Sequence, residues 1–123
     1  MTTIFTDADL AYLRGQRLGR LATARRDGTL QNNPVGFGYN EKLGTIDIGG
    51  HNMAQSRKFR NIAEGSQVAF VVDDVPSVDP WQVRCLEIRG DAEALTEPED
   101  SAAQIGGPII RIHPRRLIRY GIG

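Results

Sequence analysis

The chain has 123 residues, 40% of them hydrophobic, and its 15 basic residues balance its 15 acidic residues. This length fits one domain over residues 1–123 and excludes a second domain. The balanced charge argues against a protein that coats nucleic acid, because such binding needs a surplus of Lys and Arg. Any anion that the chain binds should therefore be small.

Few residues are suited to metal or disulfide chemistry. The single cysteine, Cys85, excludes a disulfide framework and a Cys-rich zinc site, and His51 and His113 have no metal-ligand spacing. We therefore expect no metal site and a reducing, cytoplasmic environment. The first residues lack a basic segment followed by an apolar one, and no apolar run approaches a membrane span, so neither a secretory signal nor a membrane partner is expected.

A capping box predicts a short helix near the start of the chain. Thr6 and Asp9 have the spacing of that motif, and apolar residues follow on one helical face. Gly15 is a suitable residue to end the helix. The sequence therefore predicts a helix over residues 7–14.

Fourteen glycines and six prolines separate short apolar runs, which is typical of many turns and short strands. The dipeptide Asp27-Gly28 predicts a hairpin turn. Strands over residues 18–24 and 30–39 are expected on either side of it. A second turn at 40–44 leads to a strand over 45–48, and the three strands would form a meander.

One internal helix is predicted after the third strand. Asn52 can cap this helix, which should end near Gly65. Its apolar sector would hold Met53, Phe59, Ile62 and Ala63. A strand follows it, because residues 68–72 form a wholly apolar and largely β-branched run typical of a buried strand.

The remaining segments are predicted to be loops and strands. The segment 73–80 is rich in Pro and Asp and predicts a loop. A long strand over 82–95 follows, in which Gly90 marks a bulge or a close backbone approach.

The end of the chain contains a polar loop over 96–104 and two strand-like pieces, 109–112 and 117–122, which Pro114 separates. The sequence thus predicts a mainly β fold of about six short strands with one inserted helix. This arrangement suits a small closed barrel better than a sandwich.

The first candidate site is the segment Ser56-Arg57-Lys58 on the predicted internal helix. Arg57 and Asn61 are four residues apart and Lys58 and Asn61 three apart, so two cations and an amide converge on one edge of the helix. Such a group near a helix N-terminus suits a phosphate. The alternative, a solvated basic helix face, remains open on this segment alone.

The second candidate is the segment 31–38, a strand that contains Pro34, Gly36 and Gly38. These residues make fewer ladder hydrogen bonds and offer little side chain for packing, so they leave the backbone exposed. A planar ring could lie against this backbone. The alternative is an edge strand with a bulge, which the sequence leaves open.

No side chain stands out as a catalyst. The histidines have no Ser or Asp partner in the order of a triad, and Cys85 lies among apolar neighbours, so hydrolysis and thiol chemistry are unsupported. The ordinary interpretation of the segment 81–84 is that Trp81 covers an edge of the core and Arg84 extends along the surface.

Taken together, these segments resemble the pyridoxamine 5′-phosphate oxidase-like family of flavin and deazaflavin proteins. The resemblance covers nearly the whole chain, and its strongest part is Ser56-Arg57-Lys58 followed by Gln82-Val83-Arg84. The other matching segments are Leu21-Ala-Thr-Ala-Arg-Arg-Asp-Gly28, Asn33-Pro-Val35, Val68-Ala-Phe-Val71, Gly90, Arg111-Ile and Tyr120-Gly121. The resemblance implies a split β-barrel that forms homodimers with two cofactor sites at the interface.

The resemblance also implies roles for single residues. Arg57 and Lys58 would hold the cofactor phosphate, the backbone of residues 33–37 would line the tricyclic ring, and Gln82 would reach that ring from the second subunit. The implied cofactor-binding residues are Asn33, Pro34, Val35, Gly36, Phe37, Gly50, Ser56, Arg57, Lys58, Asn61, Gln82 and Tyr120. Tyr120 occupies a place where flavin-binding relatives often carry Trp.

Two features narrow the set of functions that the resemblance implies. The sequence ends at Gly123, without the C-terminal Arg- and His-bearing segment that binds substrate in true pyridoxamine phosphate oxidases, so vitamin B6 oxidation is not expected. Lys58-Phe-Arg60-Asn61 resembles an actinobacterial branch that uses coenzyme F420, whose anionic tail could meet Arg25, Arg26 and Arg60.

The resemblance therefore implies an F420H2-dependent reductase that delivers hydride to an activated double bond of a small organic substrate. The alternatives are an FMN-dependent oxidoreductase and a non-catalytic F420- or flavin-binding protein.

Overall fold

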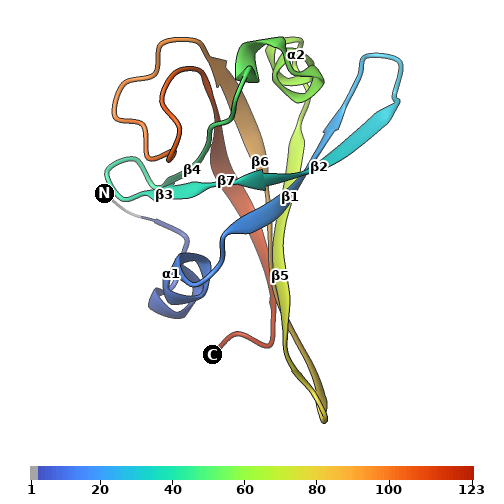
Figure 1. Ribbon diagram of the computed structural model, residues 1–123, viewed down its shortest axis with the longest axis vertical. Helices are drawn as coiled ribbons and strands as arrows, with labels where there is room; N and C mark the ends of the chain where they lie inside the picture. The colour runs from blue at the N-terminus through green and yellow to red at the C-terminus, as the bar shows by residue number, and fades with distance from the viewer. Residues whose placement is uncertain (1–2) are drawn as a thin grey trace.

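A seven-stranded antiparallel sheet forms the frame of the molecule, and the computed structural model describes it within residues 3–123. Its strands are β1 (Leu18–Ala24), β2 (Leu30–Gly36), β3 (Gly38–Asn40), β4 (Thr45–Ile48), β5 (Val68–Val78), β6 (Trp81–Leu95) and β7 (Ile109–Tyr120). They run in the order β2-β1-β5-β6-β7-β4-β3, and the sheet curls into a half-barrel (Figure 1). The predicted mainly β, split-barrel fold is confirmed, with seven strands instead of about six.

Helix α1 (Asp7–Arg14) has the predicted bounds and the predicted capping box. The Thr6 hydroxyl accepts from the Asp9 amide at 3.1 Å, and the Asp9 carboxylate accepts from the Thr6 amide at 2.9 Å. That carboxylate also accepts from Arg119 at 2.7 and 2.9 Å, which ties the helix to the end of β7. Gly15 follows the helix with φ −84°, so its access to left-handed conformations is not used.

The predicted meander is wrong, because the expected strand over 30–39 divides at Phe37. β2 pairs with β1 and β3 pairs with β4, so the two halves lie at opposite edges of the sheet. β4 pairs with β3 and β7 and not with β2. Gly38 follows the division, where a Cβ atom would collide with the carbonyl group of Ala102.

The internal helix begins later than predicted. Asn52 has φ 54° and makes no side-chain cap to the short 3-10 helix η1 (Met53–Gln55) that follows it. Ser56 caps α2 (Arg57–Ala63) instead, and its hydroxyl accepts from the Phe59 amide at 3.3 Å. Met53, Phe59 and Ile62 are buried as predicted, whereas Ala63 is exposed.

The segment 73–80, predicted as a loop, is part of a long hairpin. β5 continues to Val78 and stays paired with β6, with a register shift between Asp74 and Ser77. Arg84 binds both carboxylate oxygens of Asp74, at 2.6 and 3.0 Å, so the acidic segment has a partner across the hairpin. The tip projects from the body of the sheet (Figure 1).

The two strand-like pieces at the end of the chain are one continuous strand, so the predicted break at Pro114 is wrong. Pro114 lies opposite Gly90 at a register shift between β6 and β7, where the ladder is already interrupted. The predicted bulge at Gly90 is confirmed, and a Cβ atom there would collide with the carbonyl group of His113. A proline is tolerated because a bulge needs fewer ladder hydrogen bonds.

The core lies on the concave side of the sheet. Its fully buried side chains include Leu21, Ile46, Ile48, Phe70, Val72, Leu86, Ile88, Ile110 and Ile112. On the other side of β4 and β7, the segment 99–102 covers a buried ion pair in which Arg111 Nε donates to Asp47 Oδ1 at 3.0 Å. Within residues 3–123, no helix has the length and apolar character that crossing a bilayer requires.

Candidate cofactor site

Helix α2 packs on the core-facing side of the β1–β2 hairpin at one end of the half-barrel. Asn61 on this helix is buried, and its amide nitrogen donates to Thr23 Oγ1 of β1 at 2.9 Å. Thr23 is the cross-strand partner of Gln31 on β2. The contact therefore places the inward face of the helix over the inward face of the hairpin.

Four buried side-chain atoms of α2 and β2 have no hydrogen-bond partner in residues 3–123. They are Gln31 Oε1, Asn33 Oδ1, Arg57 Nε and Asn61 Oδ1. Gln31 and Asn33 alternate onto the same face of β2, and Arg57 lies one helical turn before Asn61. Buried polar atoms are nearly always bonded in folded proteins, so this polar layer, defined by those four atoms, suits a ligand that carries donors and acceptors.

Two cations border the polar layer. Arg57 and Lys58 are half-buried, and neither has an ion-pair partner in the described part of the chain. Burial lowers the pKa of Lys58, which means that its charged form is poorly solvated. An anion placed here would restore the lost stabilisation of both charges.

Strand β2 supplies the third part of this region. It is an edge strand, paired with β1 on one side only and with an unbroken register. The bulge considered from the sequence is therefore absent from this pairing. The side chains of Val35 and Phe37 are buried in the core and Pro34 is exposed, so a ligand would meet the backbone edge more than the side chains.

Ser56 and Gly50 have evident structural tasks. The Ser56 hydroxyl caps α2 and donates to the Met53 carbonyl oxygen at 2.7 Å. Gly50 lies in the turn between β4 and η1, where a Cβ atom would touch Met53 Cε at 3.6 Å. Sequence reasoning assigned no role to Thr23 and included Gln31 only as part of the candidate segment 31–38, although the predicted Asp27-Gly28 turn sets the register that pairs them.

Gln82 and Tyr120 are not near α2. They line a hollow of about 490 Å³ beside the turn of the β5–β6 hairpin, together with Trp81. Figure 1 shows α2 at one end of the long axis and this hairpin at the other. Trp81 does not cover the core as expected, because it is 68% exposed. One chain thus carries two separate groups of the residues that the sequence singled out.

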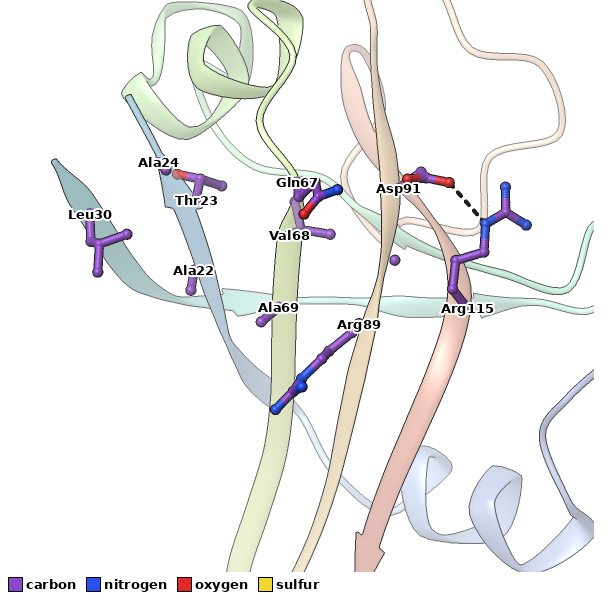
Figure 2. Close-up of a pocket in the computed structure, with 11 residues that line it drawn as sticks. Ala22, Thr23, Ala24, Leu30, Gln67, Val68, Ala69, Arg89, Asp91 and Arg115 are labelled. Carbon is purple, nitrogen blue, oxygen red and sulfur yellow. Dashed lines mark hydrogen bonds and ion pairs between the residues drawn. The ribbon is translucent and has the colours of Figure 1, made fainter. Parts of the chain in front are cut away.

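The convex face of the sheet holds a groove of about 440 Å³ (Figure 2). Small side chains of β1 and β5 form its floor, namely Ala22, Ala24 and Ala69. Figure 2 shows Leu30 at one side, the ion pair of Asp91 and Arg115 at the other, and Arg89 between them. Leu30 is 79% exposed beside this groove.

Comparison with known proteins identifies the family of the chain. Residues 5–118 match the family described as pyridoxamine 5′-phosphate oxidase. The chain belongs to this family. It is an oxidoreductase of the split-barrel type, and the resemblance noted in its sequence is confirmed.

A relative from Streptomyces rimosus, the 5a,11a-dehydrotetracycline/5a,11a-dehydrooxytetracycline reductase, is 49% identical over 119 residues, which are 96% of this chain and 84% of the relative. Two solved structures share the fold. The FAD binding protein from Mycobacterium smegmatis aligns over 97% of this chain and 98% of its own, with a TM-score of 0.70 and 20% identity. An F420 reductase aligns over 84% and 90%, with a TM-score of 0.62 and 24% identity.

Proposed function

We propose that the chain is an F420H2-dependent reductase that acts as a homodimer and reduces an activated carbon–carbon double bond of a small organic substrate. The observation that carries the proposal is the polar layer beneath α2, with two cations beside it that have no ion-pair partner among residues 3–123. The 49% identity to a reductase of dehydrotetracyclines supports the type of reaction.

The residues around α2 fit the phosphate end of such a cofactor. Arg57 and Lys58 would pair with its phosphodiester, and Asn33 and Asn61 would bond its polar groups through the oxygens that have no protein partner. Arg25 and Arg26, which line a cleft of about 320 Å³ beside the end of α2, would face the anionic tail. The motif Lys58-Phe-Arg60-Asn61 favours F420 by its resemblance to the F420-using branch.

The chain's own task in the reaction is to bind, orient and exclude water. When bound, reduced F420 supplies a hydride for one carbon of the double bond, and a proton must reach the other. The edge of β2 offers backbone groups to the ring, and the buried side chains of Val35 and Phe37 hold that edge in place. No side chain is assigned as the proton donor, which leaves water to fill that role.

A second copy of the chain would complete the site. Gln82 and Tyr120 lie at the opposite end of the molecule from α2, so they can meet the cofactor only in a neighbouring copy. The groove on the convex face, with its alanine floor and exposed Leu30, offers an apolar surface for that copy. A chain of this size also gains from a partner, since a small domain buries a limited share of its surface.

The second candidate is an FMN-dependent oxidoreductase with the same fold. The FAD binding protein that shares the fold favours this candidate, because FAD is a flavin. The polar layer and its two cations would serve an FMN phosphate equally well.

Side-by-side fluorescence titrations of the purified protein with F420 and with FMN test the proposal. We expect tight F420 binding and no tight FMN binding. The loaded protein should then oxidise F420H2 when given enones, quinones or a dehydrotetracycline. A yellow protein that binds FMN tightly would establish the second candidate, and tight F420 binding without turnover on any of these acceptors would indicate a binding protein.

A further inference from the structure

The only tryptophan of the sequence, Trp81, stands in an unusual place. It is 68% exposed at the start of β6, and it lines the hollow of about 490 Å³ together with Tyr120, which is 67% exposed. Large aromatic side chains normally gain most of their stabilisation by burial. Two of them, exposed on adjoining strands around one hollow, are typical of a binding surface.

The backbone beside these rings is open on one side. β5 pairs with the start of β6 through Val78 and Trp81, whereas β7 pairs with β6 only as far as Tyr120 opposite Cys85. Residues 81–84 of β6 therefore present one edge to the hollow, and a strand edge carries free amide and carbonyl groups. A flat ligand with an apolar face and a polar rim suits this combination of rings and backbone.

The cation that lines the hollow already has an acidic partner, so an anionic ligand is not expected there. Arg84 also lines the hollow, but its guanidinium is held by both oxygens of Asp74 and lies over the ring of Tyr12, 5.0 Å from the ring centre. The hairpin turn is fixed by Ser77 Oγ, which donates to the Pro80 carbonyl oxygen at 2.7 Å. Trp81 is thus presented on a braced turn, beside a cation that is already paired.

We propose that Trp81 determines substrate specificity by stacking against a planar fused-ring substrate of the polyketide type, while its neighbour Gln82 faces the cofactor. This inference rests on the proposed function and deepens it. Both side chains line the hollow, and because successive side chains of a strand diverge, the substrate would lie against Trp81 and the cofactor against Gln82. The relative that acts on dehydrotetracyclines has substrates of this shape, and a hollow of about 490 Å³ is in the range that accepts a ligand of that size.

Calorimetric titration with tetracycline, a stable compound of the fused-ring type, tests the role of Trp81. The titration uses the cofactor-loaded protein in four forms: unmodified, Trp81→Ala, Trp81→Phe and Val78→Ala. We expect Trp81→Ala to weaken tetracycline binding roughly tenfold or more and Trp81→Phe to retain most of it, because Phe keeps an aromatic face. Val78→Ala is the control, since Val78 is 75% exposed on the same hairpin and does not line the hollow.

The cofactor titration separates the possible outcomes. The inference holds if Trp81→Ala weakens tetracycline binding and leaves F420 affinity within about twofold. It is overturned if the variant binds tetracycline like the unmodified protein, if the unmodified protein binds F420 but no tetracycline, or if the variant loses F420 affinity as well. If the unmodified protein binds neither F420 nor FMN, the proposed function fails, and the same tetracycline titrations on the protein as purified test Trp81 by itself.

Discussion

Lys58 differs from most basic side chains of this protein in what surrounds it. Arg84 and Arg119 are each held by a carboxylate, at 2.6 and 2.7 Å, and Lys42 lies 3.0 Å from Asp100. Lys58 has no acidic partner in residues 3–123, and burial lowers its pKa. Its charged form is therefore poorly stabilised in the free protein, and an anionic ligand would supply the missing stabilisation.

Replacing Lys58 by Ala should weaken cofactor affinity by about one to two orders of magnitude, because a charge-assisted hydrogen bond in a partly buried site is lost. A fluorescence titration with F420 measures the change. Lys42→Ala is the matched control, since Lys42 is the other lysine of the sequence and is 69% exposed. Equal affinities of the two variants would remove Lys58 from the site.

We expect the charge of Asp47 to affect the stability of the chain more than the charge of any other residue. Burial favours its neutral form, but hydrogen bonds from Arg111, Asn40, Ala102 and Thr45 outweigh burial and hold its pKa below the ordinary value. A depressed pKa in the folded state adds stability that is present above the unfolded value, about 3.9. That stability is lost as the pH falls through the folded value.

The variant Asp47→Asn should lower the free energy of unfolding by about 3 kcal/mol, because it leaves the buried Arg111 without its counter-ion. Urea denaturation at neutral pH measures this loss, which should shrink in acid as Asp47 becomes protonated in the unmodified protein. Glu41→Gln is the control. Glu41 pairs with Arg14 on the surface at 3.2 Å, where such pairs contribute less than about 1 kcal/mol. Similar losses for both variants would contradict this account of Asp47.

Among the elements, the segment 96–108 depends on small residues of the strands beneath it. A side chain at Gly38 would collide with the backbone of Ala102, whereas one at Gly106 would meet open space. Gly38→Ala should therefore cost roughly 1–3 kcal/mol of stability. Gly106→Ala should stay within about 0.5 kcal/mol of the unmodified protein, as substitutions on open surface do. Thermal unfolding of both variants gives the comparison, and a neutral Gly38→Ala would show that the segment moves away easily.

The elements that the sequence predicted well are those with a local signal. The capping box marked the start of α1, Gly15 marked its end, and Gly90 marked the bulge of β6. The sequence failed where a distant partner decides the structure. In the sequence Asp74 is typical of a loop, and its partner Arg84 is evident only once the two strands are paired. The division at Phe37 likewise follows from the pairing of β3 with β4.

The arrangement of the candidate site residues can likewise be predicted where the signal is local and not where it depends on distant residues. The motif around Arg57 and Lys58 indicated the cations, because neighbours in sequence share one short helix. It placed Asn61 on the same edge of the helix, but the burial of its side chain against Thr23 depends on a strand far away in the sequence. The role of Gln31 depends on the pairing of two strands, which no single segment encodes.

For the whole molecule, the decisive fact is the separation of the two groups of candidate residues. Lys58 lies on α2 at one end of the half-barrel, and Gln82 lies next to the turn of the projecting hairpin, which is at the other end (Figure 1). In the proposed function, one cofactor meets Lys58 from one copy and Gln82 from the other. A homodimer related by a two-fold axis would form two equal sites, each with Lys58 from one copy and Gln82 from the other.

Complementation between two inactive variants tests this shared site most directly. Lys58→Ala and Gln82→Ala should each bind F420 weakly, whereas co-expression of the two forms should restore tight sites. In a mixed dimer, one site receives both substitutions and the other receives neither. With random pairing, tight binding should therefore return to about one quarter of the unmodified capacity. If the mixture binds no more tightly than the separate variants, or if the protein sediments as a monomer, the site is not shared and the account is wrong.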